Sequence, residues 1–403
     1  MNITFPLILD GAMGTQLQKA GLPAGCCPEK WVLEHPEVCK KIQRAYVGSG
    51  TQVLYAPTFG ANAAMLEGHG IFSEVEDYNK RLVEISKSVA GEKAMVAGDI
   101  SSIGGMLYPL GDMSFNDMYD IYLEQAAALE KAGVDLFVIE TMTSVPEARA
   151  ALLAVKAVSD KPVFVSFSCD ENGRTMMGTD VCAALIIMQG MGADAFGLNC
   201  STGPAEMLAQ IKRLYDHAEI PLIAKPNAGL PVTVDGKTVY NVAPEEFAGF
   251  VPALADAGVS IFGACCGSDE RYIAAIKAAL DGVTVKETSP LYPELLPAAS
   301  EKDVFLLSPE AECVSVFACD GELEDNICEL DEDELFGIEI GSPEDVAEFS
   351  DAQYAIRNPL CIFCDDAILL EKALRAYQGR ALYDGALSDA ELIPLCEKYG
   401  LII

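Results

Sequence analysis

Short apolar segments recur along the first 280 or so residues, and a stretch with helical periodicity follows each of them. The apolar segments read PLILDGA, TQVLYAPTF, AMVAGDIS, DLFVIETM, PVFVSFSC, AFGLNC, PLIAKPNA and IFGACCG. Met118 to Ala132 exemplifies the intervening segments, because its apolar residues share one helical face. Nearly continuous apolar strands that alternate with helices are typical of a parallel sheet covered by helices. Eight such units predict a (β/α)8 TIM barrel rather than an open doubly wound sheet, and no dinucleotide fingerprint follows an early strand.

A barrel of this kind also predicts where a functional site forms. Its functional side chains gather at the carboxyl ends of the strands, where the loops that lead into the helices meet. The polar and thiol residues at these positions are Asp10, Thr58, Asp99, Glu140, Cys169, Cys200, Asn227 and the adjacent pair Cys265 and Cys266. We therefore expect a site at this end of the barrel.

The pattern changes after residue 285. Residues 286–302 contain three prolines and no clear period, which indicates a linker or a wrapping strap. Residues 303–403 are too few for a second barrel, and their strand-like and helix-like segments predict a small C-terminal α/β domain of unknown role. From residue 301 onward the chain holds 25 acidic and 6 basic residues, which is more than half of its excess negative charge. This acidity either attracts a basic patch on a partner or is simply a solvated surface.

The formal net charge of −34 limits the partners that we expect. Nucleic acids and anionic membrane surfaces repel such a chain. No apolar stretch approaches the roughly 20 residues that span a bilayer, and the N-terminal MNITFPLILDGAMG has no basic region typical of a signal peptide. We therefore expect a cytoplasmic protein, in which the 14 cysteines are reduced thiols.

Three of these thiols point to a metal. Cys200 ends the sixth predicted strand, and Cys265 and Cys266 end the eighth, between Gly263 and Gly267. Three thiolates with one open position suit catalytic Zn²⁺, which prefers tetrahedral sulfur and nitrogen ligands. A single cysteine at a strand end is usually only a buried hydrophobic residue, but a converging pair and a third thiol are not. The other adjacent pair, Cys26 and Cys27, lies in a loop without this strand-end placement, so we expect no metal there.

Together with these cysteines, several motifs in residues 1–285 resemble those of the homocysteine S-methyltransferases. This family includes the homocysteine-binding module of cobalamin-dependent methionine synthase and the betaine-dependent enzymes. The matching motifs are LDGAMGTQLQ, PEKWVLEHPE, YAPTFGAN, VIETM, GLNCSTGP, KPNAGLP and GACCGS. The resemblance implies a homocysteine-binding zinc barrel in which Cys200, Cys265 and Cys266 are the three zinc ligands.

The resemblance also implies roles for residues around the metal. Asp10 and Glu140 would receive the ammonium group of homocysteine, and the amides around Gly11 and Ala12 would hold its carboxylate. Thr58 would line the same pocket. Asn227 would fill the open zinc position until the substrate thiol displaces it. Two simpler interpretations stay open, since Asp10 could cap the first helix and Thr58 could only satisfy backbone groups.

The implied reaction is methyl transfer to the homocysteine thiol, which gives methionine. The resemblance is nearest to the methionine synthase module, which implies a methyl-corrinoid such as methyl-cobalamin on a partner protein as the donor. The single Trp31 and 8% aromatic residues offer no obvious cage for a cationic donor. S-methylmethionine, betaine or a different thiol acceptor are alternatives within the same chemistry. A non-catalytic sensor of thiol or zinc is the alternative from another class of protein.

Overall fold

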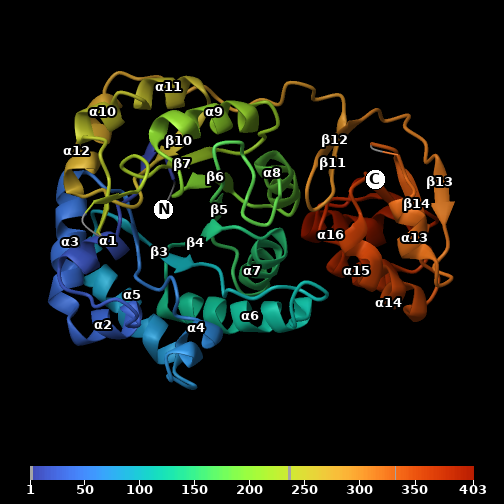
Figure 1. The fold of residues 1–403 in the computed structure, drawn as a ribbon, viewed down its shortest axis with the longest axis horizontal. Helices are drawn as coiled ribbons and strands as arrows, with labels where there is room; N and C mark the ends of the chain where they lie inside the picture. Colours follow the sequence, from blue (N-terminus) through green and yellow to red (C-terminus); the bar gives the residue numbers. More distant parts are fainter. Residues whose placement is uncertain (1–2, 235–236, 332) are drawn as a thin grey trace.

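The computed structural model describes residues 3–234, 237–331 and 333–403. Eight parallel strands form one sheet in the order β1-β10-β7-β6-β5-β4-β3-β2. A parallel bridge between Leu9 and Val53 then joins β1 to β2 and closes the barrel, which confirms the predicted fold (Figure 1). The strands are β1 (Leu7–Ile8), β2 (Val53–Tyr55), β3 (Met95–Ile100), β4 (Leu136–Met142), β5 (Val163–Phe167), β6 (Ala195–Asn199), β7 (Leu222–Lys225) and β10 (Val259–Phe262).

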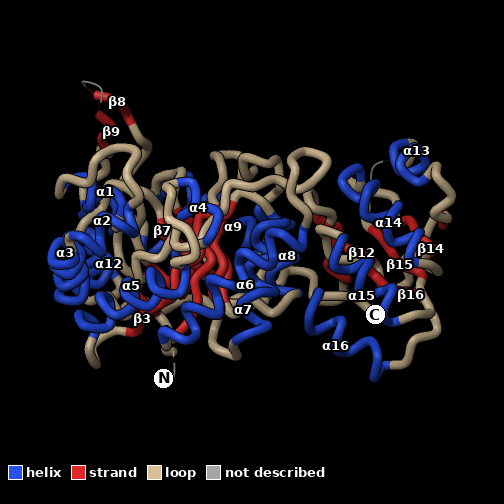
Figure 2. Tube along the Cα trace, turned by 90° about the horizontal axis from the view of Figure 1, so that it is seen from below, coloured by secondary structure: helices blue, strands red, loops and turns tan. Residues whose placement is uncertain are grey.

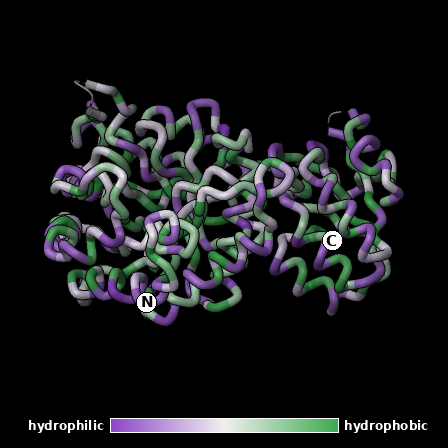
Figure 3. The backbone as a smooth tube through the Cα atoms, turned by 60° about the horizontal axis from the view of Figure 1, so that its bottom comes forward, coloured by the Kyte–Doolittle hydropathy of each residue, from purple (hydrophilic) through white to green (hydrophobic). Residues whose placement is uncertain are grey.

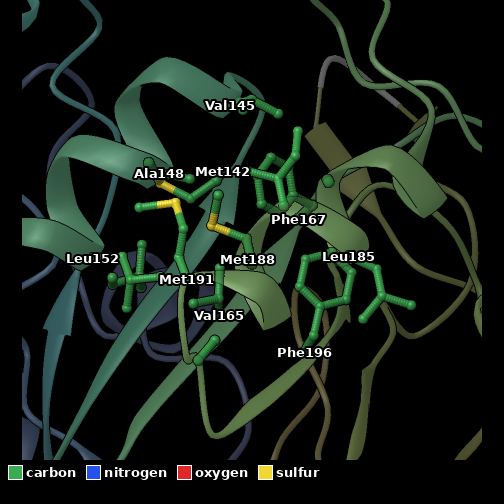
Figure 4. Packing of buried hydrophobic residues seen from close by; sticks show 14 of the residues in the cluster. Met142, Val145, Ala148, Leu152, Val165, Phe167, Leu185, Met188, Met191 and Phe196 are labelled. Carbon is green, nitrogen blue, oxygen red and sulfur yellow. The ribbon is translucent and has the colours of Figure 1, made fainter. Parts of the chain in front are cut away.

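Helices cover the outside of this barrel. The longer ones are α3 (Pro36–Ser49), α5 (Val75–Ala90), α6 (Phe115–Ala132), α7 (Val145–Val158), α8 (Val181–Gly190), α9 (Pro204–Tyr215) and α12 (Glu270–Ala279). Shorter helices are α1 (Gly14–Lys19), α2 (Pro28–Glu34), α4 (Ala63–Gly68), α10 (Pro244–Ala248) and α11 (Val251–Asp256). Figure 4 shows how Met142 of β4, Val165 and Phe167 of β5 and Phe196 of β6 pack against apolar side chains of the neighbouring helices. This outer layer buries the face of each strand that points away from the barrel axis.

Local sequence signals fix the ends of these helices. At α6, the Ser114 hydroxyl accepts from the Asp117 amide and the Asp117 carboxylate accepts from the Ser114 amide, which is a reciprocal cap. Gly133 ends the same helix with a φ of 75°, a left-handed conformation that glycine adopts without strain. The predicted helix from Met118 to Ala132 is therefore confirmed and begins three residues earlier.

A second cluster of buried side chains fills the interior of the barrel. It takes alternate residues from the strands, because successive side chains of a strand point to opposite faces. Its members are Leu7, Leu9, Val53, Tyr55, Met95, Ala97, Leu136, Val138, Phe164, Ala195, Ile223 and Ile261. The barrel is thus a packed core, and the next inward positions toward the carboxyl ends of the strands form its mouth.

An antiparallel hairpin interrupts the alternation after β7. Its strands are β8 (Val232–Val234) and β9 (Lys237–Val239). Figure 2 shows the hairpin projecting from one end of the barrel, opposite the end at which the N-terminus lies. Because it follows the carboxyl end of β7, it stands at the mouth.

The C-terminal unit contains a four-stranded parallel sheet in the order β13-β14-β15-β16. Its strands are β13 (Ser315–Phe317), β14 (Phe336–Glu339), β15 (Leu360–Phe363) and β16 (Leu382–Asp384). Its helices are α13 (Leu323–Cys328), α14 (Pro343–Ala352), the 3-10 helix η1 (Gln353–Ala355), α15 (Ala367–Ala376) and α16 (Asp389–Tyr399). Hydrophobic and hydrophilic segments alternate along the chain in both units (Figure 3), as in helices and strands with one buried face.

The segment predicted as a linker, residues 286–302, is only partly irregular. Its end contains β11 (Leu296–Ala299), which pairs antiparallel with β12 (Val304–Leu307). The Ala299 carbonyl also accepts from the Arg380 amide at 2.7 Å, so this segment ties the C-terminal unit down rather than spacing it away.

A buried arginine joins the two units. Arg149 of α7 is 1% exposed and donates from Nη1 to Gln378 Oε1 and from Nη2 to the Leu374 carbonyl, both at 2.9 Å. Its guanidinium also lies 5.6 Å from the ring of Phe115. A charge buried this deeply needs such partners, so the contact fixes the C-terminal unit against the barrel wall. Among the described residues, no helix is long and apolar enough to cross a membrane.

Candidate metal and substrate site

The inward-facing positions of the strands change from apolar in the barrel interior to polar at the mouth. Ala97, Val138, Phe164 and Ile223 belong to the interior cluster. The residue two positions further along each strand is polar, and Gly197 of β6 is likewise followed at this spacing by a polar residue. These polar residues are Asp99, Glu140, Ser166, Asn199 and Lys225. The sequence therefore places a ring of polar side chains directly above the apolar core.

The three predicted thiols converge at this mouth. One sulfur atom from each of Cys200, Cys265 and Cys266 lies within 4.8 Å of the others, and the sulfurs of Cys200 and Cys266 are 3.7 Å apart. Two sulfur atoms bound at about 2.3 Å to one tetrahedral metal would be roughly 3.8 Å apart. The cluster thus has the spacing of a thiolate metal site, and it is the one group of three or more such ligands that the described part of the chain contains.

Backbone hydrogen bonds hold the cysteines from three strands. The Cys200 amide donates to the Lys225 carbonyl at 3.1 Å, and the Cys265 amide donates to the Pro226 carbonyl at 2.8 Å. The Cys266 carbonyl accepts from the Ala228 amide at 2.9 Å. Cys200 has a φ of 62°, a left-handed conformation that is uncommon outside glycine. Strain of this kind is typical of functional sites, where the surrounding bonds hold it.

Crowding of the thiols opposes their ionisation. A hydrogen bond from Cys265 lowers the pKa of Cys200, but Cys266 and burial raise it to a net value of about 11. The pKa of Cys265 is raised well above its ordinary value, first by its hydrogen bond with Cys200. Three thiolates this close require a compensating cation, which is what a divalent metal supplies.

A tyrosine that the sequence analysis did not select lies against this cluster. The Tyr240 side chain lies beside Cys266 and is among the groups that shift the pKa of that thiol. Its ring fits only because residue 267 is glycine, since a Cβ there would lie 2.3 Å from Tyr240 Cγ. Tyr272 donates to the Val242 carbonyl at 2.6 Å and so fixes the segment that follows Tyr240. The glycine after the cysteine pair, readable in GACCGS, is the signal for a close neighbour of the cysteines.

The two predicted carboxylates meet around a lysine. The ammonium group of Lys225 lies 3.4 Å from Asp10 Oδ1 and 3.2 Å from Glu140 Oε2. Asp10 Oδ2 accepts from the Tyr55 amide at 2.9 Å, whereas α1 begins after Met13. The alternative that Asp10 caps the first helix is therefore wrong. Burial raises the pKa of Asp10 to about 6, although Lys225 lowers it.

The residues near Asp10 are partly committed to internal bonds. The Ala12 amide donates to Ser268 Oγ at 3.1 Å, and the Ala12 carbonyl accepts from the Tyr46 hydroxyl at 2.7 Å. Gly11 is a glycine for a steric reason, since a Cβ there would lie 2.8 Å from the Tyr46 ring. Thr58 Oγ1 donates to the Asp99 carbonyl at 2.8 Å and accepts from its amide at 3.0 Å. In this structure the Thr58 hydroxyl thus satisfies backbone groups.

Three buried oxygen atoms at the mouth have no hydrogen-bond donor among the described residues. They are Asp10 Oδ1, Asp99 Oδ1 and Asn227 Oδ1, and their residues are 1%, 5% and 2% exposed. Asp10 Oδ1 faces the Lys225 ammonium group at 3.4 Å. For the other two atoms, burial without a partner is uncommon and indicates a missing ligand group or ion. Asn227 was selected from the sequence, whereas Asp99 was noted only as a strand-end residue. Burial and the neighbouring Glu140 raise the pKa of Asp99 well above its ordinary value.

Asn199 connects the carboxylate and thiol parts of the site. Its Oδ1 accepts from the Thr141 amide and from Ser166 Oγ, both at 2.9 Å. Its Nδ2 donates to Thr141 Oγ1 at 2.7 Å and lies 4.0 Å from the sulfur of Cys265. Thr141 has a φ of 60°, and the register between β4 and β5 shifts beside it. A bulge of this kind re-aims a side chain, here the adjacent Glu140.

Two cavities flank the barrel end. One of about 690 Å³ opens beside the thiols and is lined by Ser168, Ser201, Thr202 and Leu230 among others. A larger one of about 920 Å³ lies between the barrel and the C-terminal unit, where Arg213 pairs with Asp180 at 2.5 Å. Only the first adjoins the metal cluster. Elsewhere, Cys27 donates to Glu29 at 3.3 Å and Cys26 is exposed.

A closed (β/α)8 barrel with three thiols converging at its mouth is the class of protein that the fold and the site define. A family model described as homocysteine S-methyltransferase matches residues 7–280. The chain belongs to the homocysteine S-methyltransferase family, which confirms the resemblance read from its motifs.

Known relatives agree with this assignment. The chain is 33% identical over 292 residues to a methionine synthase of Mycobacterium leprae, a match that covers 68% of the chain and 24% of the relative. It is 32% identical over 304 residues to a methionine synthase of Mycobacterium tuberculosis, covering 71% of the chain and 25% of the relative. The chain thus spans about a quarter of the length of these relatives.

Solved structures support the fold. The oxidized form of the homocysteine methyltransferase MmuM from Escherichia coli matches with a TM-score of 0.57 and 23% identity, over 68% of this chain and 95% of that one. A metallated form of the same protein matches with a TM-score of 0.57 and 22% identity over the same shares of the two chains. Both matches cover about two thirds of this chain.

Proposed function

We propose that this chain transfers a methyl group to the thiol of homocysteine and forms methionine, with Zn²⁺ held by Cys200, Cys265 and Cys266. The observation that carries the proposal is the spacing of the three sulfur atoms, which lie within 4.8 Å of one another at the mouth of a barrel of this family. Three soft thiolates favour zinc over hard cations, which prefer oxygen ligands.

Bound Zn²⁺ would supply the positive charge that keeps the substrate thiol deprotonated at neutral pH, where a free thiol with a pKa of about 8.5 is mostly protonated. The protein residues then hold and orient the substrate. Glu140 would accept hydrogen bonds from its ammonium group, and the amide of Gly11 would donate to its carboxylate. Asn227 Oδ1, buried and without a donor in the described structure, would lie near the open metal position.

A methyl-corrinoid carried by another protein or module is the donor that we favour. The relatives with 32–33% identity are methionine synthases, of which this chain matches about a quarter. A cationic small-molecule donor would need an aromatic surface. At the mouth, the ring of Tyr55 already contacts the Lys225 ammonium group at 3.6 Å. The single tryptophan of the chain, Trp31, stacks on His35 at 4.3 Å.

Metal analysis and a donor assay test this proposal together. The purified chain should hold about one zinc ion, and Cys265→Ser should lose most of it. Cys169→Ser is the matched control, because Cys169 also follows a barrel strand and is buried but lies outside the cluster. Full zinc retention in Cys265→Ser would remove the basis of the metal site.

The zinc-loaded chain is then incubated with homocysteine and one donor at a time, namely methyl-cobalamin, S-methylmethionine or betaine. We expect methionine with methyl-cobalamin. Methionine from S-methylmethionine or betaine alone would replace the corrinoid by a small-molecule donor. No methionine from any of the three would overturn the proposed activity for the isolated chain.

A further inference from the structure

Lys225 is an unassigned cation in the centre of the site. It is the last residue of β7 and is 4% exposed. Its ammonium group contacts Asp10 at 3.4 Å, Glu140 at 3.2 Å and the ring of Tyr55 at 3.6 Å. Burial lowers its pKa, but Glu140, Tyr55 and Asp10 hold the pKa well above its ordinary value.

The barrel provides a dedicated space for this side chain. A Cβ at Gly263 would lie 2.9 Å from Lys225 Cγ, so the glycine leaves room for the aliphatic stem. Ile223, two residues earlier, packs in the barrel interior, and alternation directs Lys225 to the same face. A buried cation is costly unless charged partners surround it, and here two carboxylates and an aromatic face do so.

With Lys225 in place, the two carboxylates differ in how accessible they are to a ligand. The Asp10 side chain is 2% exposed and the Glu140 side chain is 10% exposed. Asp10 therefore has no room for a second cation while Lys225 is in place, whereas Glu140 keeps an accessible edge. Asp10, Glu140 and Lys225 form a group of two carboxylates and one ammonium, which carries one net negative charge when both carboxylates are ionised.

We propose that Lys225 is a positioning residue that neutralises Asp10 and leaves Glu140 as the acceptor for the ammonium group of the substrate. This inference rests on the proposed function, because it assumes that the substrate is homocysteine. One net negative charge matches the single ammonium group of the substrate. Lys225 occupies the position between the two carboxylates and so prevents the substrate ammonium group from entering it.

The test removes the charge of Lys225 with little change in its length. In Lys225→Met, the ammonium group of homocysteine should move into the vacated position, where two carboxylates attract it. Calorimetry on the zinc-loaded protein compares homocysteine with 4-mercaptobutyrate, which lacks only the amino group. We expect the preference for homocysteine to rise about tenfold or more, while kcat with homocysteine falls because the substrate is displaced. Lys212→Met, on the exposed surface of α9, is the control.

A double variant distinguishes the effect of the changed charge from an effect of misfolding. Asp10→Asn with Lys225→Met removes a buried pair of opposite charges and restores one net negative charge, so the preference for homocysteine should return toward its wild-type value. An unchanged or reduced preference in Lys225→Met would overturn the role of the lysine. So would a double variant that keeps the raised preference. A wild-type chain that binds no homocysteine would overturn the proposed function instead.

Discussion

Gly267, directly after the cysteine pair, allows a sharp test of how the metal cluster is packed. Its φ is 86°, and a Cβ there would lie 2.3 Å from Cγ, 2.5 Å from Cδ2 and 2.6 Å from Cβ of Tyr240. Gly267→Ala thus adds one methyl group where both the backbone and a ring oppose it. The ring has little freedom to withdraw, since Val242, two residues on, is bonded to both Ala228 and Tyr272.

Two costs add up in this variant. A non-glycine residue in a left-handed conformation costs roughly 1–2 kcal/mol, and forcing a methyl group into a packed site costs roughly 1–3 kcal/mol. We therefore expect the free energy of unfolding to fall by about 2–5 kcal/mol. The melting temperature should fall by on the order of 5–15 °C at the 2–4 °C per kcal/mol typical of large domains. Zinc retention should fall as well, because Tyr240 loses its position against Cys266.

Gly178 provides a matched control for this experiment. Its φ is 85°, and a Cβ there would meet no atom within 4 Å. Gly178→Ala should therefore show only the backbone cost, roughly 1–2 kcal/mol. Denaturant titration of both variants, and of Gly267→Ala in a Tyr240→Ala background, isolates the collision. Equal losses at Gly267 and Gly178, or no relief when the ring is removed, would refute the packing that we describe.

Other contacts lead to further predictions. Asn199→Ala removes the acceptor that holds the left-handed Thr141 amide and should cost about 1–3 kcal/mol in urea titration; a loss below 0.5 kcal/mol would contradict it. Arg149→Met removes the buried cation between the two units, so limited proteolysis between residues 286 and 303 should accelerate while Gln378→Ala does less; unchanged cleavage would argue against this contact. Asp10 has a folded pKa of about 6 against about 3.9 unfolded, so the folded state binds more protons between these values and stability should fall by about 2 kcal/mol as pH rises from 4 to 6. Asp10→Asn should flatten that profile, and an identical slope in the variant would assign it to other groups.

Most of the barrel and the cysteine cluster follow from the sequence because each leaves a local pattern. All eight apolar segments form barrel strands, and the placement of Cys200 and the Cys265–Cys266 pair at strand ends is sufficient to bring them together. In the C-terminal unit, β14 and the two helices α13 and α14 were not predicted, and β14 is a strand of only four residues that Gly337 interrupts. The ring of Phe363 lies against Gly337, and this contact becomes visible only in the folded sheet.

The pairing of Lys225 with Asp10 and Glu140 could not be predicted in the same way. A lysine at a strand end reads as exposed, and its burial becomes visible only when β4 and β7 occupy the same closed barrel. The left-handed backbone conformation of Thr141 could not be predicted either, because threonine rarely adopts it. Alternation within each strand would have pointed to Asp99, Asn199 and Lys225, each two residues beyond an interior position.

Residues at the ends of β6 and β7 contact both the cysteines and the carboxylates of the site. The Lys225 carbonyl accepts from the Cys200 amide, while the side chain of the same residue holds Asp10 and Glu140. Asn199 repeats this arrangement, since it reaches the sulfur of Cys265 and also fixes the backbone beside Glu140. The distance from the thiols to the Glu140 carboxylate is therefore set by the backbone of the strands rather than by loops. Under the proposed function, a substrate with a thiol at one end and an ammonium group at the other would meet two fixed points, and the barrel itself would select its chain length.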